Sequence, residues 1–319
     1  MSSSSTGANT RYFLGLDGGG TKTECVLADA EGNVLARSFA GASNPLRAGY
    51  TRAWFALSEA GDAVLRRERL RAKDISGVCA GLGGAGRSSV VNRSTTFFER
   101  SYPNAAVRVT TDLDVGLEAA FGTGEGILLL AGTGSAAFGR DAGGRIARAG
   151  GRGPWFSDEG SAFDIGRSAV RAVALFEEHR GPATALSKKL FSWNDSGNWD
   201  VLLDQIAKNA DDVFPKLFPV VAQVADKGDA GAREILTAAA SSLAELARCV
   251  ASELGWLERD VPVAQLGGVY GRSKYFDAEI AAALAKSLPR ARVVRVETSP
   301  AEAAARMAIR LVAAKGNAA

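Results

Sequence analysis

Three consecutive glycines, Gly18–Gly20, follow an apolar segment and an aspartate near the start of the chain, and Thr21 and Lys22 come directly after them. Glycine has a high conformational entropy in the unfolded chain, so three glycines at a strand end indicate that bare backbone is needed there. Unhindered backbone N–H groups, with a hydroxyl and an ammonium group beside them, are suited to holding a phosphate. We interpret this segment as a phosphate-binding loop made of Gly18, Gly19, Gly20, Thr21 and Lys22; a purely structural glycine turn is the alternative.

A second glycine-rich loop follows another apolar segment, Ile127–Ala131, in the middle of the chain. Its residues are Gly132, Thr133, Gly134 and Ser135, which combine two hydroxyls with two unhindered backbone amides. An ordinary tight hairpin is the alternative interpretation. Each loop, however, lies between two strand-like segments, over residues 12–40 and 127–149. This repeated pattern predicts an internal duplication with one phosphate loop in each half.

The segment after Lys22 argues against one class of phosphate-binding fold. A dinucleotide-binding fingerprint requires a helix directly after its glycines. Here Thr23–Ala30 and Val34–Phe39 have the pattern of two strands joined by a tight turn. The first loop is therefore predicted to be the turn of a β-hairpin, and a Rossmann fold is not expected.

The other residue types narrow the chemistry. The single histidine, His179, lies in a charged stretch that is expected to be a solvated helix face. The three cysteines are scattered, which suits a reducing, cytoplasmic compartment and argues against a cysteine-bound metal or iron–sulfur site within this chain. Catalysis is thus expected to use carboxylates, hydroxyls, backbone amides and a divalent cation.

Composition sets the broad class. The chain has 319 residues, of which 46% are hydrophobic and 23% charged, and this favours a globular protein of two domains. A net charge of +3 gives no indication of a nucleic-acid or membrane partner, and no apolar run approaches the roughly 20 residues of a membrane span. Residues 1–11 are mostly polar and are expected to be a disordered lead-in.

The remaining pattern alternates strands and helices, which predicts an α/β fold. The first half has the order β-β-β-α-β-α-β-α, and the second has three strands, a helical insertion, and then strand, helix and strand. We expect an N-terminal domain over residues 12–122, completed by a C-terminal helix over 300–315, and a second domain over 123–299. After the first hairpin, the main expected elements are Tyr50–Arg69, Ile75–Leu82, Ser88–Arg100, Val107–Thr111, Leu113–Phe121, Val261–Leu266, Phe276–Ser287, Arg292–Val296 and Pro300–Val312.

Seven short motifs support a more specific assignment. In chain order they are LGLDGGGTKT (14–23), GASNP (41–45), GLGGAGR (81–87), TTD (110–112), LAGTGS (130–135), SDEGSAFDIG (157–166) and LGGVYGR (266–272). Each motif is weak alone, but the ordered set resembles the N-acetylglucosamine kinase family and the BadF/BadG/BcrA/BcrD ATPase group. The resemblance implies a two-domain actin-like ATPase (ribonuclease H-like) fold with duplicated halves.

The resemblance also implies ATP and Mg²⁺ as cofactors. The first loop and Thr133, Gly134 and Ser135 would hold the β- and γ-phosphates. Gly267 and Gly268 would lie against the adenosine, although a strand-to-helix turn would use the same residues. Asp17 would act on Mg²⁺ through the metal's water shell, because Mg²⁺ keeps several waters in proteins.

Asp112 matches the family's catalytic aspartate, which orients the sugar hydroxyl and takes its proton during phosphoryl transfer. An ordinary helix N-cap is the alternative role for this residue. Asp114 is the rival candidate, but it falls inside the helix predicted at Leu113–Phe121, from which pointing into a cleft is harder. We therefore favour Asp112 as the base.

The resemblance assigns sugar contacts to Asn44, Asp112, Thr133, Arg152, Gly153 and Asp158. Asn44 could instead open a turn, and Asp158 could begin a helix. Relatives commonly carry Trp where Arg152 stands and Gly where Ser157 stands. An arginine here suits an anionic substituent such as a lactyl carboxylate, and a solvated rim residue is the other interpretation.

The sequence thus predicts an ATP-dependent kinase that phosphorylates the 6-hydroxyl of N-acetylglucosamine or glucosamine. N-acetylmuramic acid or another hexose is the alternative acceptor. An ATP-driven activator of a partner enzyme is a further alternative, although such activators hold an iron–sulfur cluster through cysteines. A sugar-sensing regulator is disfavoured, since no DNA-binding helix pair precedes residue 12. A homodimer is expected from the resemblance.

Overall fold

The computed structural model describes residues 11–193 and 197–316. The chain divides into two compact units: unit 1 contains residues up to 123 and from 297 onward, and unit 2 contains residues 124–296. The predicted lead-in lies outside the described residues except for Arg11. The division falls one residue after the expected domain boundary, and the C-terminal helix belongs to unit 1.

Unit 1 is built on a five-stranded sheet with the order β3-β2-β1-β4-β5. Its strands are β1 (Tyr12–Gly18), β2 (Thr23–Ala28), β3 (Val34–Ala40), β4 (Ile75–Leu82) and β5 (Ala106–Thr111). The first three strands pair antiparallel, and β4 and β5 continue the sheet parallel to β1. The hairpin predicted after the first loop is confirmed, and β1, β4 and β5 end at the same edge of the sheet.

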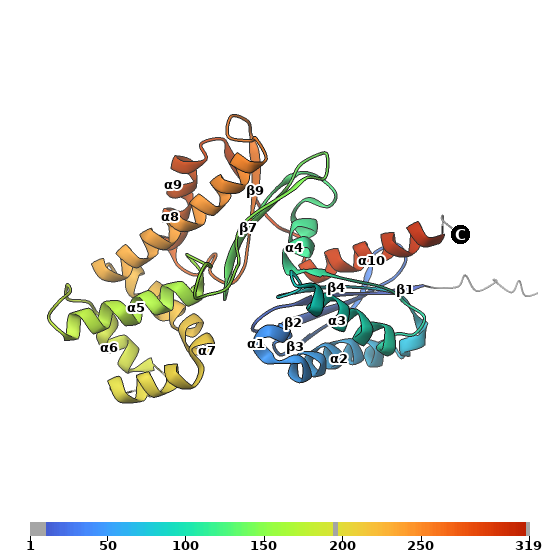
Figure 1. The fold of residues 1–319 in the computed structure, drawn as a ribbon, viewed down its shortest axis with the longest axis horizontal. Coiled ribbons are helices and arrows are strands. Elements are labelled where there is room, and N and C mark those ends of the chain that lie inside the picture. The colour runs from blue at the N-terminus through green and yellow to red at the C-terminus, as the bar shows by residue number, and fades with distance from the viewer. Residues whose placement is uncertain (1–10, 194–196, 317–319) are drawn as a thin grey trace, which may run out of the picture. The chain divides into compact units, whose positions relative to one another are not determined.

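Helices cover both faces of this sheet (Figure 1). They are α1 (Pro45–Ala48), α2 (Tyr50–Arg67), α3 (Ser88–Ser101), α4 (Asp112–Phe121) and α10 (Pro300–Gly316), with a 3₁₀ turn at Ala72–Asp74. Alternate residues of β1 point to opposite faces: Leu14 and Leu16 join a core with α2 and α3, while Phe13 joins α10. Gly15 faces α10 as well, because a Cβ there would overlap the backbone of that helix.

Unit 2 repeats the same sheet. Its strands are β6 (Gly126–Ala131), β7 (Ser135–Arg140), β8 (Ile146–Gly150), β9 (Val261–Leu266) and β10 (Ala291–Val294). Read from β8, the order is β8-β7-β6-β9-β10, with three antiparallel strands followed by two parallel ones. This is the topology of unit 1, so the internal duplication predicted from the two loops is confirmed.

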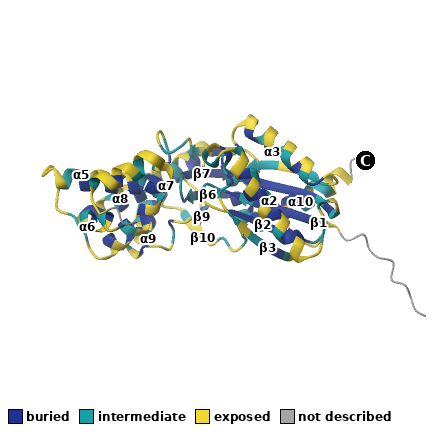
Figure 2. Ribbon diagram, turned by 90° about the horizontal axis from the view of Figure 1, so that it is seen from below, coloured by how far each residue is buried: buried dark blue, intermediate teal, exposed yellow. Residues whose placement is uncertain are grey.

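The helices between β8 and β9 form the predicted insertion. They are α5 (Ala162–Glu177), α6 (Leu186–Phe191), α7 (Trp199–Asp226) and α8 (Ala230–Glu253), and α9 (Lys274–Ser287) follows β9. α7 is kinked at Asn209, whose backbone leaves the helical region. α8 packs against β6, β7 and β8, and α9 packs against α8. Figure 2 shows the buried residues running along the strands and the sheet-facing sides of the helices.

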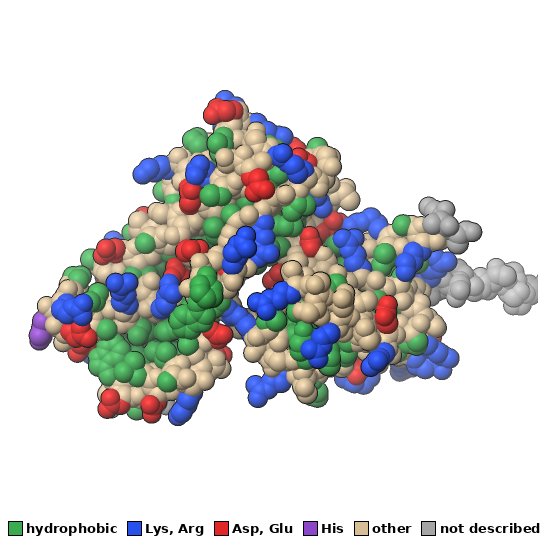
Figure 3. Space-filling view, viewed as in Figure 1, with side chains coloured by type: hydrophobic (Ala, Val, Ile, Leu, Met, Phe, Trp, Pro, Cys, Tyr) green, Lys and Arg blue, Asp and Glu red, His purple; other side chains and the backbone are tan. Residues whose placement is uncertain are grey.

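Two features of the structure bear on a possible membrane or nucleic-acid partner. Within the described ranges, α8 alone has the length and apolar composition of a membrane span. Its apolar residues, among them Leu236, Leu243 and Ala247, join the core of unit 2, so we describe α8 as a core helix. Lys and Arg side chains are scattered over the face shown in Figure 3 and do not gather in a stripe.

Candidate functional site

The first loop is the tight turn between β1 and β2. The Gly19 amide donates to the Lys22 carbonyl at 3.0 Å, which closes the turn. A Cβ on Gly18 would clash with the Ser43 hydroxyl and the Leu82 side chain, whereas a Cβ on Gly19 would meet nothing closer than the Lys22 oxygen at 3.7 Å. Gly18 is therefore required by packing, and Gly19 leaves open backbone. Thr21 and Lys22 are exposed, and Gly20 is half-buried.

Two carboxylates lie at the edge where β1 and β5 end. Asp17 is half-buried near the end of β1, and Asp112 directly follows β5, one strand away across β4. The pKa of Asp17 is raised to about 7, mainly by burial and in addition by the negative charges of Asp112 and Glu24. Lys22 opposes this shift. The structure thus brings Asp17 and Asp112 close enough for their charges to interact.

Glu24 is a part of this cluster that sequence reasoning missed. It pairs with Asp17 in the β1–β2 register and is only 5% exposed. Arg37 of β3 forms ion pairs with Glu24 and with Glu302 of α10. A charged residue beside the apolar run Cys25–Ala28 was the available signal, since buried charges are normally paired.

The start of α4 differs from the sequence prediction in one respect. The helix begins at Asp112, and its N-cap is Thr111, so the alternative role of Asp112 as the N-cap is wrong. The reason is a capping box: the Thr111 hydroxyl accepts from the Asp114 amide at 3.1 Å, and the Asp114 carboxylate accepts from the Thr111 amide at 3.2 Å. Thr110 and Thr111 also donate their hydroxyls to Asp114. Asp114 is therefore engaged in holding the helix end.

Asn44 lies beside the first loop. The amides of Ser43 and Asn44 both donate to the Gly19 carbonyl, at 3.1 and 3.0 Å. The Asn44 side chain accepts from the Leu46 amide at 3.0 Å, so Asn44 is the N-cap of the short helix α1. A Cβ on Gly83 would lie 2.9 Å from the Asn44 Nδ2 atom, which explains the glycine at that position. Asn44, Asp17, Asp112 and Gly19 all belong to unit 1.

The second loop joins β6 to β7. Its turn is closed by the Gly132 amide, which donates to the Gly134 carbonyl at 2.8 Å. Thr133 is half-buried. Ser135 is 2% exposed, and its hydroxyl donates to the Glu159 carbonyl at 2.7 Å. The Ser135 hydroxyl is thus bonded to the segment that precedes α5, and only the Ser135 backbone is left for a phosphate.

Asp158 lies against the second loop. It is 5% exposed and has a left-handed backbone with φ of 75°, an unusual conformation for a residue with a side chain. Its Oδ1 atom accepts from the Gly153 amide at 3.3 Å, and its Oδ2 atom would lie 2.6 Å from a Cβ placed on Gly134. α5 begins later, with Ser161 as its N-cap. Arg152 is exposed.

Gly267 and Gly268 follow β9 beside the second loop. Gly267 has φ of 125°, and a Cβ there would overlap the Ala131 backbone, so packing and conformation both require glycine. Gly268 is exposed, and a Cβ there would meet nothing within 4 Å. A Cβ on Gly132 would lie 3.7 Å from the Gly268 amide nitrogen. Unit 2 thus brings the second loop, Asp158, Gly153 and Gly268 together.

The donor set of unit 1 fits a magnesium ion. No group of three or more His, Cys, Asp or Glu side chains within the described ranges is arranged to hold a metal. Mg²⁺ is usually bound through one or two carboxylates, with phosphate oxygens and water completing its shell. Asp17 supplies one such carboxylate, and a cation beside it would favour the ionised form that burial and the charges of Asp112 and Glu24 disfavour.

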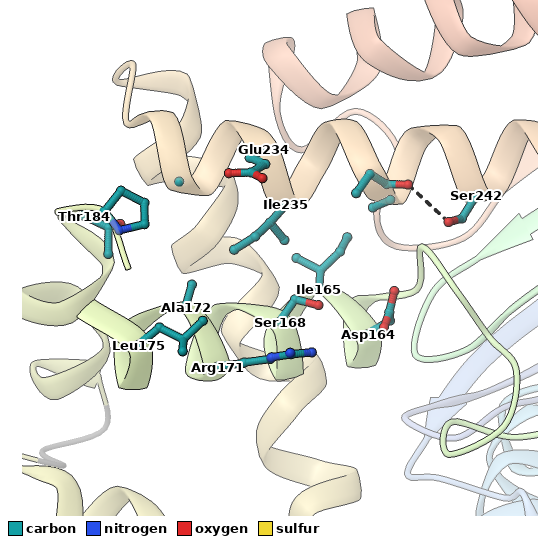
Figure 4. A pocket seen from close by; sticks show the side chains of 14 residues that line it. Asp164, Ile165, Ser168, Arg171, Ala172, Leu175, Thr184, Glu234, Ile235 and Ser242 are labelled. Atoms are coloured by element: carbon teal, nitrogen blue, oxygen red, sulfur yellow. Dashed lines mark hydrogen bonds between the residues drawn. The ribbon is translucent and has the colours of Figure 1, made fainter. Parts of the chain in front are cut away.

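A cavity of about 380 Å³ lies in unit 2 between α5 and α8 (Figure 4). Ile165 and Ile235 project into it from the two helices, and Asp164 lies at one end. Asp164 also accepts from the Gly160 amide at 3.0 Å. None of the site residues predicted from the sequence lines this cavity.

Two curated relatives match nearly the whole chain. The N-acetylmuramic acid/N-acetylglucosamine kinase of Clostridium acetobutylicum is 27% identical over 293 residues, which cover 91% of this chain and 96% of that protein. The N-acetyl-D-glucosamine kinase of Dictyostelium discoideum is 28% identical over 317 residues, covering 93% of this chain and 97% of that protein.

A solved structure from Chromobacterium violaceum, described as a candidate N-acetylglucosamine kinase, superposes with a TM-score of 0.76 at 26% identity. The match covers 96% of this chain and 100% of the other. This likeness confirms the two-domain actin-like fold that the duplicated sheets indicate. The model of the BadF/BadG/BcrA/BcrD ATPase family matches residues 14–305, and the chain therefore belongs to this family.

Proposed function

We propose that this protein is an ATP-dependent sugar kinase that transfers the γ-phosphate of ATP to the 6-hydroxyl of N-acetylglucosamine or glucosamine. The observation that carries the proposal is the edge of the unit 1 sheet, where Asp17 and Asp112 interact electrostatically beside the open backbone of Gly19. An acceptor base, a cation site and a phosphate loop are the parts that phosphoryl transfer requires. Similarity to sugar kinases over more than 90% of the chain supports the same reading.

Each predicted residue has a role in this proposal. Asp112 orients the acceptor hydroxyl and takes its proton as the bond to phosphorus forms. Asp17 holds the water shell of Mg²⁺, which when bound neutralises charge on the β- and γ-phosphates. Unit 1 binds the phosphates through the first loop, with Gly19, Gly20, Thr21 and Lys22.

Unit 2 supplies the remaining contacts. The backbone of Thr133, Gly134 and Ser135 holds the phosphates, and Gly267 and Gly268 let the adenosine approach the chain. Asn44 from unit 1 and Thr133, Arg152, Gly153 and Asp158 from unit 2 bind the sugar. A carboxylate such as Asp158 accepts from two vicinal hydroxyls, which suits a sugar ring.

The proposal is tested by measuring phosphate transfer from ATP to a panel of sugars: N-acetylglucosamine, glucosamine, N-acetylmuramic acid, glucose and mannose. ³¹P NMR of the product tests whether the phosphate is attached at the 6-hydroxyl of the sugar. We expect the highest kcat/KM for N-acetylglucosamine or glucosamine. Turnover confined to glucose or mannose would contradict the amino-sugar assignment and leave the kinase assignment standing.

N-acetylmuramic acid is the second candidate acceptor, and one observation favours it. Arg152 is an exposed guanidinium in the segment that leads to Asp158, and its planar fork matches a carboxylate such as that of a lactyl group. Arg152→Ala should lower kcat/KM for N-acetylmuramic acid about tenfold if the guanidinium meets that carboxylate. Turnover of N-acetylglucosamine by the same variant serves as the control, because that sugar lacks the carboxylate.

The alternative of an ATP-driven activator receives less support. Cys25 and Cys79 are fully buried in β2 and β4, and burial raises the pKa of both thiols. Only Cys249 of the three cysteines is exposed. An iron–sulfur cluster needs accessible thiolate ligands, which Cys25 and Cys79 do not offer in this fold. Visible absorption bands of a cluster in the isolated protein would revive this alternative.

A further inference from the structure

The two phosphate loops are fastened to their surroundings in the same way. In each hairpin, a hydroxyl residue opens the second strand: Thr23 opens β2 and Ser135 opens β7. Thr23 pairs with the last residue of β1 and Ser135 with the last residue of β6, so the two positions are equivalent in the duplicated sheets. Both side chains are buried, with 0% and 2% exposure.

Each hydroxyl reaches a segment that carries a proposed sugar ligand. In unit 1, the Thr23 hydroxyl oxygen lies 2.7 Å from the Gly41 carbonyl oxygen and 2.6 Å from the Ser43 hydroxyl oxygen, next to Asn44. In unit 2, the Ser135 hydroxyl donates to the Glu159 carbonyl at 2.7 Å, next to Asp158. Because a hydroxyl has one proton and two lone pairs, Thr23 can serve both of its partners at once.

A second contact repeats in the same place. The first residue after β1 is Gly19, whose carbonyl accepts from the Ser43 and Asn44 amides. The first residue after β6 is Gly132, whose carbonyl accepts from the Ala162 amide at 2.9 Å. Each phosphate loop is therefore tied twice to the segment beside it, once through a loop carbonyl and once through a buried hydroxyl.

We propose that Thr23 and Ser135 are positioning residues, each holding a sugar-binding segment in register with the phosphate loop of its own unit. They act through Asn44 and Asp158 and do not themselves need to touch the sugar. This inference rests on the proposed function, since it assumes that Asn44 and Asp158 bind the acceptor. Under this proposal the Ser135 hydroxyl bonds the Glu159 carbonyl and does not contact a phosphate.

The first test compares Thr23→Val, which keeps the side-chain shape, with Thr23→Ser, which keeps the hydroxyl. Losing the buried hydrogen bonds of Thr23 should raise the acceptor KM about tenfold, with the ATP KM changed by less than about threefold. Thr23→Ser should stay close to wild type. An unchanged acceptor KM in a folded Thr23→Val protein would overturn the proposal.

Ser38→Ala is the matched control. The Ser38 hydroxyl donates to the Ala60 carbonyl at 2.6 Å, between β3 and α2 in the same unit. Its removal should lower the melting temperature as Thr23→Val does, but should leave both KM values unchanged. Equal changes of the acceptor KM in both variants would mean that Thr23 has only a general structural role.

Ser135→Ala tests the proposal for unit 2. A higher acceptor KM supports the positioning role, whereas a higher ATP KM with an unchanged acceptor KM would show a direct phosphate contact and overturn the proposal for Ser135. Should Thr23→Val be insoluble, Ser43→Ala removes one partner of Thr23 and is expected to raise the acceptor KM by a smaller factor. No rise would count against the proposal.

A readout that does not depend on catalysis separates this inference from the proposed function. The Ser43 and Asn44 amides bond the Gly19 carbonyl, so their hydrogen exchange reports how firmly the segment is held. Thr23→Val should speed their exchange about tenfold, and Ser38→Ala should not. Unaltered exchange contradicts the positioning role. Absence of transfer to every sugar would instead contradict the proposed function.

Discussion

Unit 1 and unit 2 share a sheet topology but offer different chemistry at the equivalent edge. In unit 1, Asp17 lies at the end of β1, Asp112 follows β5, and the loop carries Lys22. In unit 2, the corresponding positions are Leu130, the last residue but one of β6, and Arg295, which follows β10. The duplication has thus kept the hairpin that exposes backbone, while strand-end carboxylates stand in one copy only.

This difference suggests a division of work. In the proposed function, unit 1 supplies the carboxylates that act on the acceptor proton and on Mg²⁺. Unit 2 is proposed to supply a hydroxyl and bare backbone. Its buried carboxylate, Asp158, comes from the segment before α5 rather than from a strand end. Changes to charge in unit 1 should therefore cost turnover, and changes to backbone access in either unit should cost substrate affinity.

The largest expected effect is at Asp112. Asp112→Asn should lower kcat by about a thousandfold, since it removes the proposed base. Asp114→Asn is the control, because Asp114 holds the capping box of α4; it should cost about 1 kcal/mol of stability and keep most of the turnover. Steady-state kinetics and thermal melts of both variants check this. The opposite pattern would transfer the role of base to Asp114.

The glycines of the first loop should separate ligand access from packing. Gly19→Ala fits the fold, so we expect an unchanged melting temperature and an ATP KM raised about tenfold or more. Gly18→Ala clashes with Ser43 and Leu82, so it should lose about 1–3 kcal/mol of stability. Thermal melts of each variant without nucleotide measure its stability, and the shift on adding ATP reports its affinity for the nucleotide. Normal ATP affinity in Gly19→Ala would count against the phosphate loop.

The same comparison in unit 2 should give a smaller effect. Gly268→Ala has free space around the new methyl group, and it should raise the ATP KM by roughly threefold to tenfold if the adenosine lies against this backbone. Gly267→Ala should destabilise the fold, because its positive φ and the Ala131 backbone exclude a side chain. An ATP KM that Gly268→Ala leaves unchanged would contradict the proposed contact between adenosine and the Gly268 backbone.

The smallest effect concerns stability and pH. The pKa of Asp17 is raised to about 7 in the folded protein, so the folded state binds a proton more tightly than the unfolded state. Stability contributed by this group is then lost as the pH rises from about 4 to about 7. Asp17→Asn, measured without Mg²⁺ and nucleotide, should therefore be more stable than the wild type at pH 8 and little changed in stability at pH 4. A stability gain that does not depend on pH would contradict this origin.

Much of the fold could be predicted from the sequence, because it depends on local patterns. The apolar runs and turn residues indicated the first hairpin, and the repeat of the pattern at residues 127–149 indicated the duplication. The bounds of β4 and β9 were predicted correctly. The start of α4 was misplaced by one residue, since a capping box depends on the side-chain geometry of Thr111 and Asp114.

The site could be predicted less completely, because it depends on neighbours distant in sequence. Gly18 and Gly19 look alike in the sequence, and only Ser43 and Leu82 make one of them a packing glycine. The hydroxyls of Thr23 and Ser135 are buried by segments about twenty residues further along the chain. The homodimer, the cytoplasmic location and the individual contacts to ATP and sugar stay predictions.

The most direct test of the central claim is transfer of labelled γ-phosphate from ATP to N-acetylglucosamine by the purified wild-type protein with Mg²⁺, with the product identified by mass and ³¹P NMR. The account predicts a sugar 6-phosphate formed in equal amount to ADP. ATP hydrolysis without a phosphorylated product, for this sugar and for every other acceptor in the panel, would contradict it.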